Sequence, residues 1–272
     1  MSKIWFVTGA SRGLGRHFVE AAVAEGDKVV ATARNIDGVK DLAVKHGEAV
    51  LPLQLDVTDR AAAVSVVQEA IAHFGRIDVV VNNAGFGLFG AVEEITEEQA
   101  RDQIEVNYLG ALWVTQAVLP QMRTQGSGHI IQVSSTFGVA AFPLFGGHHA
   151  SKWALEGFTE SLAQEVGPLG IKVTLVEPGA YTTEWAGSSL AAAEMIPAYD
   201  HARTASQEFA EANIVPGDPA AAARGVVEVA NAENPPLRVF LGTAGLDWLP
   251  AIYADRLKTW DEWADLSRRA LK

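Results

Sequence analysis

Short apolar runs alternate with stretches of helical periodicity along most of the chain, and this alternation constrains the fold more than any other feature of the sequence. The runs that predict strands are Ile4–Val7, Lys28–Ala33, Val50–Leu55, Ile77–Val81, His129–Val133, Ile171–Val176 and Leu237–Leu241. Several are almost wholly apolar, as expected for strands that helices cover on both faces. The pattern predicts an α/β fold, with a doubly wound, mostly parallel sheet and helices on both faces.

Capping residues set the expected limits of the intervening helices. An alanine- and valine-rich helix is expected over Asp59–Phe74, with Thr58 or Asp59 as its N-cap and Gly75 as its terminator. Thr96 is expected to open a long helix, with Gln99 placed for a capping box. A third helix is expected from about Ala150 to Val166.

No linker rich in proline, glycine and serine and no internal repeat divides the 272 residues, so a single domain over residues 1–272 is expected. The segment from Thr183 to Pro216 breaks the strand–helix rhythm. It is interpreted as a substrate lid, because sites in this architecture lie at the carboxyl ends of the strands, or else as a packed excursion. Residues 244–272 predict a C-terminal helical segment, whose tryptophans pack on their own chain or on a neighbour.

Composition excludes several classes of function. Acidic residues outnumber basic ones 33 to 21, and a net charge of -12 repels both a phosphate backbone and an anionic membrane surface, so neither partner is expected. The absence of cysteine excludes disulfides, a thiolate nucleophile and cysteine-ligated metals. No metal site is suggested by histidine spacing. No signal peptide is recognised, and a cytoplasmic location is expected.

A glycine-rich turn follows the first predicted strand, with Gly9, Gly13 and Gly15 in the run from Thr8. Glycines permit a tight turn and a close backbone approach, and the next helix presents free N–H groups to a pyrophosphate. Many glycine turns only redirect the chain and bind no ligand, but here the turn joins a strand to an amphipathic helix. We therefore expect nucleotide binding on a Rossmann-type fold.

These residues and six later elements resemble the short-chain dehydrogenase/reductase family. The turn has the family's T-G-x-x-x-G-x-G spacing, and the later elements come in the family's order over residues 3 to about 183. They are Asp56-Val57, Asn82-Asn83-Ala84-Gly85, Asn107, Ser134-Ser135, Ser151-Lys152, and Pro178-Gly179 followed by Thr183. The tail resembles the hydroxysteroid-dehydrogenase-like branch of that family.

The resemblance implies hydride transfer between a nicotinamide and a carbonyl or alcohol carbon. It implies that Ser135 holds the substrate oxygen, that Lys152 binds the nicotinamide ribose, and that Asn107 holds a water in a proton relay. The implied cofactor contacts are Gly9, Ser11, Arg12, Gly13, Leu14, Gly15, Arg34, Asp56, Val57, Asn83, Ala84, Gly85, Lys152, Pro178, Gly179 and Thr183.

The cofactor expected is NADP(H), with NAD(H) less favoured. An NAD site usually has a carboxylate after the second strand, but here Arg34 follows it, and the first carboxylate is Asp37. Arg34, flanked by Arg12, suits a 2′-phosphate through its planar fork. The alternative is that both are solvated surface arginines.

One catalytic position departs from the family. His148 stands four residues before Lys152, where the family has its tyrosine, and no tyrosine lies between Tyr108 and Tyr181. The charge of Lys152 disfavours an imidazolium, and a neutral imidazole donates its proton poorly. We expect carbonyl reduction to fall by about 10²–10⁴-fold, the usual contribution of a general acid.

Three interpretations of His148 stay open. It is an introduced substitution in an ordinary reductase, or a natural variant with a histidine acid or non-redox chemistry, or the mark of a cofactor-binding protein without catalysis. An isomerase or lyase on the same fold is the rival enzyme class.

Apolar candidates around the site suggest a bulky, hydrophobic ketone, aldehyde or alcohol as substrate. They are Phe86, Leu88, Phe89, Phe137, Phe142, Leu144, Phe145, Tyr181, Trp185 and Met195. Members of the family commonly pair through two long helices, which here correspond to Thr96–Met122 and Ala150–Val166. A homodimer or homotetramer is therefore expected.

Overall fold

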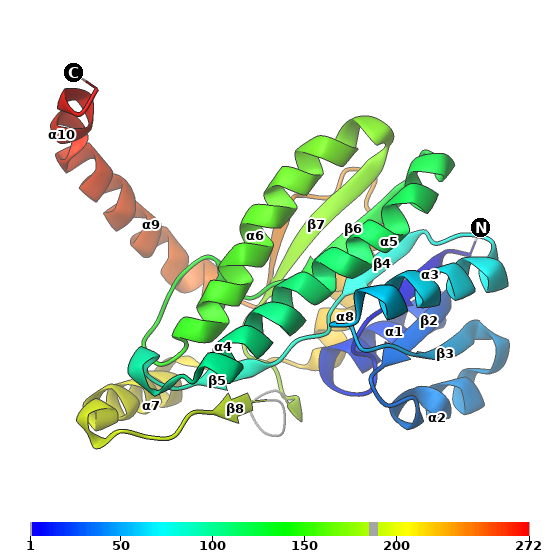
Figure 1. Cartoon of the computed structure of the whole chain (residues 1–272), viewed down its shortest axis with the longest axis horizontal. Coiled ribbons are helices and arrows are strands. Elements are labelled where there is room, and N and C mark those ends of the chain that lie inside the picture. Colours follow the sequence, from blue (N-terminus) through cyan, green and yellow to red (C-terminus); the bar gives the residue numbers. More distant parts are fainter. Residues whose placement is uncertain (1, 185–189, 272) are drawn as a thin grey trace.

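The computed structural model describes residues 2–184 and 190–271, and its centre is one seven-stranded parallel sheet (Figure 1). The strand order is β3-β2-β1-β4-β6-β7-β9. The strands are β1 Ile4–Val7, β2 Lys28–Ala33, β3 Val50–Gln54, β4 Val79–Asn82, β6 Gly128–Val133, β7 Ile171–Pro178 and β9 Arg238–Leu241. The predicted doubly wound α/β fold is confirmed, and each predicted strand is present with its ends within two residues of the prediction.

Helices cover both faces of the sheet. One face carries α1 Gly13–Ala24, α2 Asp37–His46 and α8 Pro219–Asn231, and the other carries α3 Arg60–Phe74, α5 Gly110–Gln125 and α6 Gly146–Val166. Neighbouring strand residues point to opposite faces, so Trp5 lies in the first core and Phe6 in the second. Both side chains are fully buried.

The chain reverses its order at β1, which pairs with both β2 and β4. The connections after β1 and β4 therefore leave the carboxyl edge toward opposite faces, the arrangement at which doubly wound sheets form a ligand crevice. Ligands bind at this switch point in doubly wound sheets.

The capping predictions are confirmed. Asp59 caps α3 by accepting a hydrogen bond from the Ala62 N–H at 3.0 Å, and Gly75 ends the helix in a left-handed conformation. Thr96 and Gln99 form the capping box of α4 Glu97–Ile104. The long helix predicted from Thr96 is not uniform, because a π-helical turn over Glu105–Leu109 separates α4 from α5.

The predicted start of α6 near Ala150 is wrong. The helix begins at Gly146, although glycine is a poor helix former. A Cβ at Gly146 would lie 3.0 Å from Val92, and one at Gly147 would lie 3.1 Å from Leu88. Tertiary packing of this first turn overrides the local propensity and places His148 on the helix.

The segment predicted as a lid is ordered where it is described. β8 Leu190–Ala192 pairs with β5 Gly87–Phe89, and α7 Asp200–Asn213 follows the short turn Pro197–Tyr199. Arg203 of α7 donates to the buried carboxylate of Glu94 at 2.8 Å. Trp185, one of the predicted pocket residues, lies outside the described residues.

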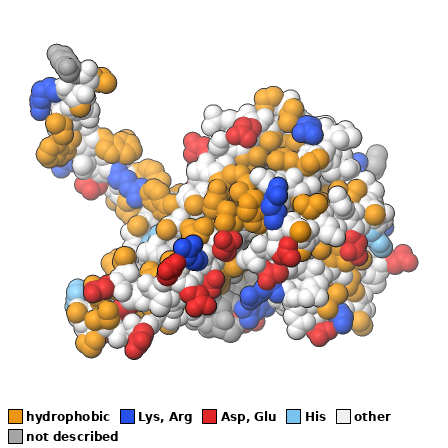
Figure 2. Space-filling view, in the orientation of Figure 1, with side chains coloured by type: hydrophobic (Ala, Val, Ile, Leu, Met, Phe, Trp, Pro, Cys, Tyr) orange, Lys and Arg blue, Asp and Glu red, His pale blue; other side chains and the backbone are white. Residues whose placement is uncertain are grey.

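The last helices leave the body of the molecule (Figure 1). The first half of α9 Ala244–Glu262 packs on the body of the molecule, with Leu249 and Ile252 against Val139 and Ala140. The end of α9 and α10 Ala264–Arg269 extend outward. We call α9 and α10 together the C-terminal arm, and Figure 2 shows apolar side chains along it. Its exposed large apolar residues are Leu246, Tyr253, Leu257, Trp260, Trp263, Leu266 and Leu271.

No helix in the described ranges is both long enough and apolar enough to span a bilayer.

Candidate active site

The glycine turn after β1 adopts a conformation that only glycine accommodates easily. Gly9 and Gly13 have φ angles of +65° and +56°. A Cβ on Gly15 would lie 2.3 Å from the Gly9 carbonyl oxygen and 2.4 Å from Asn83 Nδ2. α1 begins at Gly13, and no acidic side chain occupies its first turn. The helix N-terminus is thus a suitable anion site beside an open backbone turn.

Hydrogen bonds join this turn to the segment after β4. The Thr8 hydroxyl accepts from the backbone N–H groups of Asn83 and Ala84 at 2.9 and 3.0 Å. The Asn83 amide donates to the carbonyl oxygens of Thr8 and Gly9 at 3.0 and 3.2 Å. The side chain of Asn83 therefore holds the glycine turn in place, while the backbone of Ala84 lies against Gly9.

Of the other predicted cofactor residues, Ser11, Leu14 and Thr183 lie at or next to the turn, and Gly179 follows β7. A Cβ on Gly13 would lie 3.8 Å from the Cβ of Thr183. The side chain of Ser11 lies against Gly38, where a Cβ would be 2.8 Å away. Leu14 packs on the core of the α1 face. Gly179, after Pro178, donates to the Leu241 carbonyl at 3.0 Å, which ties the end of β7 to β9.

Asp56 and Val57 follow β3. The Asp56 carboxylate accepts from the backbone N–H and the hydroxyl of Thr58 at 3.0 and 2.8 Å. Val57 is buried and lies against Gly110, the first residue of α5. The pair thus fixes the turn beside the carboxyl edge of the sheet.

The end of β2 carries a cation and no adjacent carboxylate. Arg34 directly follows the strand and is exposed. Asp37, the first carboxylate after it, is already on α2 and pairs with Lys40 at 2.7 Å. A ribose hydroxyl at this edge would meet Arg34 before any acidic group.

The backbone of Phe86 is the hub of the predicted catalytic residues. Its N–H donates to Asn107 Oδ1 at 3.0 Å, and its carbonyl accepts from Asn107 Nδ2 at 3.0 Å and Gln103 Nε2 at 3.3 Å. The same backbone hydrogen-bonds to His148. Asn107 Nδ2 also lies 3.0 Å from Ser151 Oγ. The π-helical turn carries Asn107 into this hub, as such turns often do at functional sites.

Lys152 lies beneath the segment after β4. Its ammonium donates to the Val133 carbonyl at 2.8 Å, and a Cβ on Gly85 would lie 3.7 Å from Nζ. Burial lowers the pKa of Lys152 to about 8, against the nearby charge of Glu156, which raises it. Lys152 therefore remains mostly an ammonium at neutral pH.

Ser135 follows β6 and begins a short 3₁₀ turn over Thr136–Gly138. Its hydroxyl accepts from the Phe137 N–H at 3.1 Å. A hydroxyl that accepts one bond still carries a hydrogen to donate. Ser135 can therefore serve as a donor to a carbonyl oxygen.

His148 is buried in the first turn of α6, and its ring lies 6.0 Å from that of Phe137. Burial, followed by the charge of Lys152, lowers the pKa of His148 to about 3, against its hydrogen bond to Phe86. The imidazole is therefore neutral near pH 7. It can donate a hydrogen bond but is a weak source of a proton.

His149 is a structural residue. Nδ1 lies 2.8 Å from the Phe137 carbonyl, and the Phe142 N–H donates to Nε2 at 2.8 Å. A neutral ring with its hydrogen on Nδ1 satisfies both bonds. It holds a loop that contains Leu144, whose φ of +69° is the one positive value among described non-glycine residues.

Aromatic rings surround this loop, and we call them the aromatic cluster. Phe137 lies 4.9 Å from Phe145 and 5.6 Å from Phe142, measured between ring centroids. Its members are Phe89, Phe137, Phe142, Phe145, Phe209 and Trp248. Phe209 of α7 and Trp248 of α9 were not predicted, because nothing in the sequence brings these distant helices to the site.

The other predicted pocket residues have different positions. Leu88 and Leu144 are buried in the core, and Met195 is 60% exposed. Tyr181 packs against Gly217, where a Cβ would be 2.8 Å from its ring. Gln103 and Ser151 were missed as site residues. Gln103 lies one helical turn before Asn107, and Ser151 lies three residues after His148, so helical spacing was the one available signal.

Comparison with known proteins agrees with this geometry. The family described as short chain dehydrogenase matches residues 3–194. This chain belongs to that family. The curated oxidoreductase BOA17 of Botryotinia fuckeliana (strain B05.10) is 42% identical, over 98% of this chain and 98% of its own.

Solved structures extend the likeness to the whole fold. A crystal structure of a short-chain dehydrogenase from Streptomyces avermitilis is 40% identical, with a TM-score of 0.93 over 99% of this chain and 98% of that one. An alcohol dehydrogenase from the archaeon Thermococcus sibiricus, complexed with 5-hydroxy-NADP, is 26% identical, with a TM-score of 0.75 over 90% of this chain and 98% of that one. The chain is thus an oxidoreductase of this family, with an NADP-type complex among its structural neighbours.

Gly15→Ala should destabilise the protein by about 1–3 kcal/mol, because its Cβ cannot fit between Gly9 and Asn83 without moving the turn. Urea unfolding measures the change. Gly167→Ala is the matched control, since a Cβ there meets nothing within 4 Å in the described ranges. Equal stabilities of the two variants would contradict the assigned close contact.

His148 should make stability fall toward acid pH. The folded pKa of about 3 lies below the unfolded value near 6.5. As the pH drops below about 6.5, the unfolded chain binds a proton that the folded chain does not. The free energy of unfolding then falls by at most about 1.4 kcal/mol per pH unit. Wild type should therefore lose stability relative to His148→Gln between about pH 7 and 5 in urea titrations. If the unfolding free energies of the two proteins depend on pH in the same way, His148 is exposed to solvent in the folded state.

Proposed function

We propose that this protein is an NADP(H)-dependent oxidoreductase that interconverts a hydrophobic ketone or aldehyde and its alcohol, with activity limited by His148. The observation that carries the proposal is the hub at Phe86. It brings Asn107 and His148 together, with Lys152 close by at Gly85, at the same crevice as the glycine turn.

The residues at the crevice fit a dinucleotide. Gly9, Gly13 and Gly15 leave room for a close backbone approach, and the N-terminus of α1 suits the pyrophosphate. Lys152 would hold the nicotinamide ribose and Arg34 a 2′-phosphate. When bound, the cofactor supplies or accepts the hydride.

The chain's own residues supply orientation and hydrogen bonds. The Ser135 hydroxyl donates to the substrate oxygen and stabilises negative charge that develops there. Asn107 fixes the Phe86 segment, and Lys152 adds a positive charge within the same crevice. The neutral His148 has a single N–H, which its hydrogen bond to the Phe86 backbone uses, and a second proton is costly to add because burial disfavours the imidazolium.

The aromatic cluster supports a bulky hydrophobic substrate. Its rings line the loop between Ser135 and His148, and Phe209 of α7 joins it at 6.4 Å from Phe142. In this proposal the segment 183–216 serves as a lid through α7. A steroid-like substrate, as in the hydroxysteroid-dehydrogenase-like branch, fits such a surface. A cytoplasmic location, expected from the sequence, is also part of the proposal.

A second candidate is a non-redox enzyme, an isomerase or lyase, or a cofactor-binding protein on the same fold. The observation that favours it is the buried, neutral His148, whose hydrogen bond goes to the protein backbone. Such a site can bind the cofactor and orient a carbonyl without completing reduction.

His148→Tyr should increase NADPH consumption by about 10²-fold or more with hydrophobic ketones, because a general acid contributes about 10²–10⁴-fold. Absorbance at 340 nm measures turnover over a panel of ketones and aldehydes. His148→Phe is the control for filling the space without a hydroxyl. If both variants are inactive yet bind NADPH tightly, the second candidate is favoured.

Arg34→Ala should weaken NADPH binding by about 1.5–3 kcal/mol, the range for hydrogen bonds to charged groups, and leave NADH binding unchanged. Isothermal titration with both cofactors gives the two dissociation constants. Arg76→Ala, which lies after α3 and pairs with Asp78, is the control. A wild type that prefers NADH would overturn the cofactor assignment.

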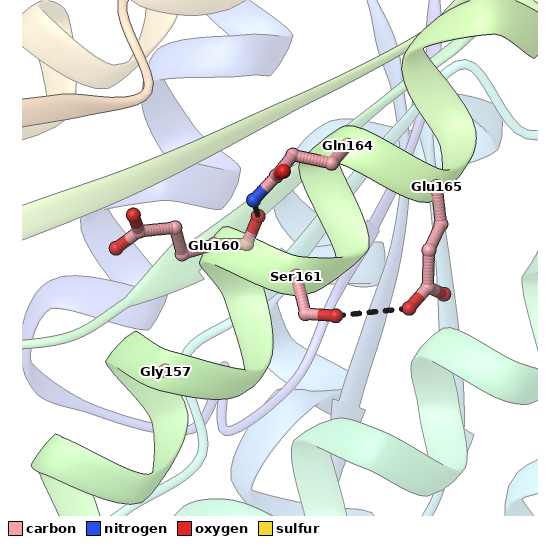
Figure 3. Close-up of a pocket in the computed structure, with 5 residues that line it drawn as sticks. All are labelled: Gly157, Glu160, Ser161, Gln164 and Glu165. Carbon is pink, nitrogen blue, oxygen red and sulfur yellow. Dashed lines mark hydrogen bonds between the residues drawn. The ribbon is translucent and has the colours of Figure 1, made fainter. Parts of the chain in front are cut away.

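The proposal also includes a homodimer or homotetramer. The outer side of α6 carries Trp153, which is 42% exposed, beside a shallow hollow over Gly157 (Figure 3). Arg256 of the C-terminal arm stacks on the Trp153 ring at 5.1 Å. The arm thus contacts the outer face of α6, and the exposed apolar residues of the arm are the proposed contact for a neighbouring subunit.

Light scattering after gel filtration should give a mass that is a multiple of 29.0 kDa. Combining Leu257→Asp with Trp260→Asp should shift the protein toward a smaller species, because two charges then face the apolar contact. Val44→Asp, at a residue of α2 that is 87% exposed, is the control. A wild-type monomer would refute the assembly.

A further inference from the structure

Three ionisable residues form a cluster that begins one helical turn after Lys152. Glu156 is one turn further along α6, Glu177 is on β7, and Arg238 is on β9. Both carboxyl groups are buried. Arg238 Nε lies 3.0 Å from Glu156 Oε2 and 3.7 Å from Glu177 Oε1, and its Nη2 lies 2.8 Å from Glu160.

The Arg238 guanidinium donates hydrogen bonds to Glu156 and Glu160 and makes no hydrogen bond to Glu177. Neither oxygen of Glu177 has a hydrogen-bond partner in the part of the chain that the structure describes. An ionised carboxylate without hydrogen bonds is costly to bury, and binding a proton removes that cost. Burial, followed by the charge of Glu156, raises the pKa of Glu177 to about 8.

Lys152 needs a counter-charge for the opposite reason. Its ammonium is buried and donates to a neutral carbonyl, Val133. Within 4.0 Å it has no acidic partner among the described residues, since their ion pairs do not include it. The charge of Glu156 opposes the effect of burial and raises the pKa of Lys152. The charge on Glu156 therefore affects whether Lys152 stays an ammonium. Burial raises the pKa of Glu156 as well, but the charge and the 3.0 Å hydrogen bond of Arg238 oppose that rise.

We propose that Glu177 carries a proton at neutral pH, and that Arg238 then holds Glu156 as the single buried counter-charge that keeps Lys152 protonated. Glu156 and Glu177 are thus positioning residues for Lys152. The link to catalysis rests on the proposed function, because it requires Lys152 to meet the cofactor.

The charged groups around the pair come from every element packed on it. α6 contributes the neutral His148 and His149 in its first turn, followed by Lys152, Glu156 and Glu160. β9 contributes Arg238. α9 contributes Arg256, which donates to the Val139 carbonyl at 3.2 Å. Arg238 is partly exposed, so the cation of the network contacts solvent while the two carboxyl groups do not.

The proton on Glu177 is tested by stability against pH. Its folded pKa is raised above the unfolded value, so the folded state binds more protons than the unfolded state between about pH 4.3 and 8. Wild-type stability should decline across this window relative to Glu177→Gln, whose amide imitates the neutral acid. Urea unfolding from about pH 5 to 9 measures the difference. If the unfolding free energies of wild type and Glu177→Gln differ by the same amount at every pH, the proposed proton on Glu177 is overturned.

The counter-charge is tested with Glu156→Gln and its matched control Glu160→Gln. Glu160 is on the same helix and pairs with the same Arg238, but it lies on the outer face (Figure 3). Glu156→Gln should move the pH midpoint at which NADPH affinity declines downward by about one unit, the size typical of a nearby charge. Glu160→Gln should leave the midpoint unchanged, and Glu156→Asp should restore most of it.

Equal midpoints in Glu156→Gln and Glu160→Gln would overturn the role of Glu156. Failure of the wild type to bind NADPH at any pH would instead refute the proposed function, while the stability comparison with Glu177→Gln still decides the protonation. Should Glu156→Gln not fold, the Glu156→Asp midpoint against wild type gives the same test, with a smaller shift expected.

Discussion

The hydrogen bonds between Thr8 and the Asn83–Ala84 segment connect the two halves of the carboxyl edge, and the rest of the site depends on them. They join the turn after β1 to the turn after β4 at the point where the sheet reverses its order. From Ala84 the chain continues through Gly85 to Phe86, whose backbone organises the predicted catalytic residues. The proposed cofactor turn and the proposed catalytic residues are consequently connected by one short segment, residues 83–86.

Much of this arrangement could be predicted because it depends on local chemistry. Apolar runs identify buried strands, closely spaced glycines after the first strand identify the turn, and Asp59 and Thr96 identify helix starts. The start of α6 could not be predicted, because it follows from the packing of Gly146 on Val92 across the fold. The same holds for Phe209 and Trp248, which reach the aromatic cluster from α7 and α9.

The chemistry of the site follows from burial more than from residue type. His148 and Lys152 are both basic side chains that burial makes less basic, to pKa values of about 3 and 8. Glu177 is an acid that burial makes less acidic. The sequence already predicts a neutral His148 and a charged Lys152 near pH 7. The proton proposed for Glu177 is the one state that only its buried position in the folded chain indicates.

The π-helical turn at Glu105–Leu109 has a further consequence for sequence change. Such a turn holds one residue more than the α-helix it interrupts, and each residue of an α-helix turns the chain by about 100°. Deleting a single residue there would regularise the helix but rotate Gln103 and Asn107 away from Phe86, or else rotate Val114 and Val118 out of the core. This helix therefore tolerates substitution far better than a change in length, although the shorter version would be the more regular helix.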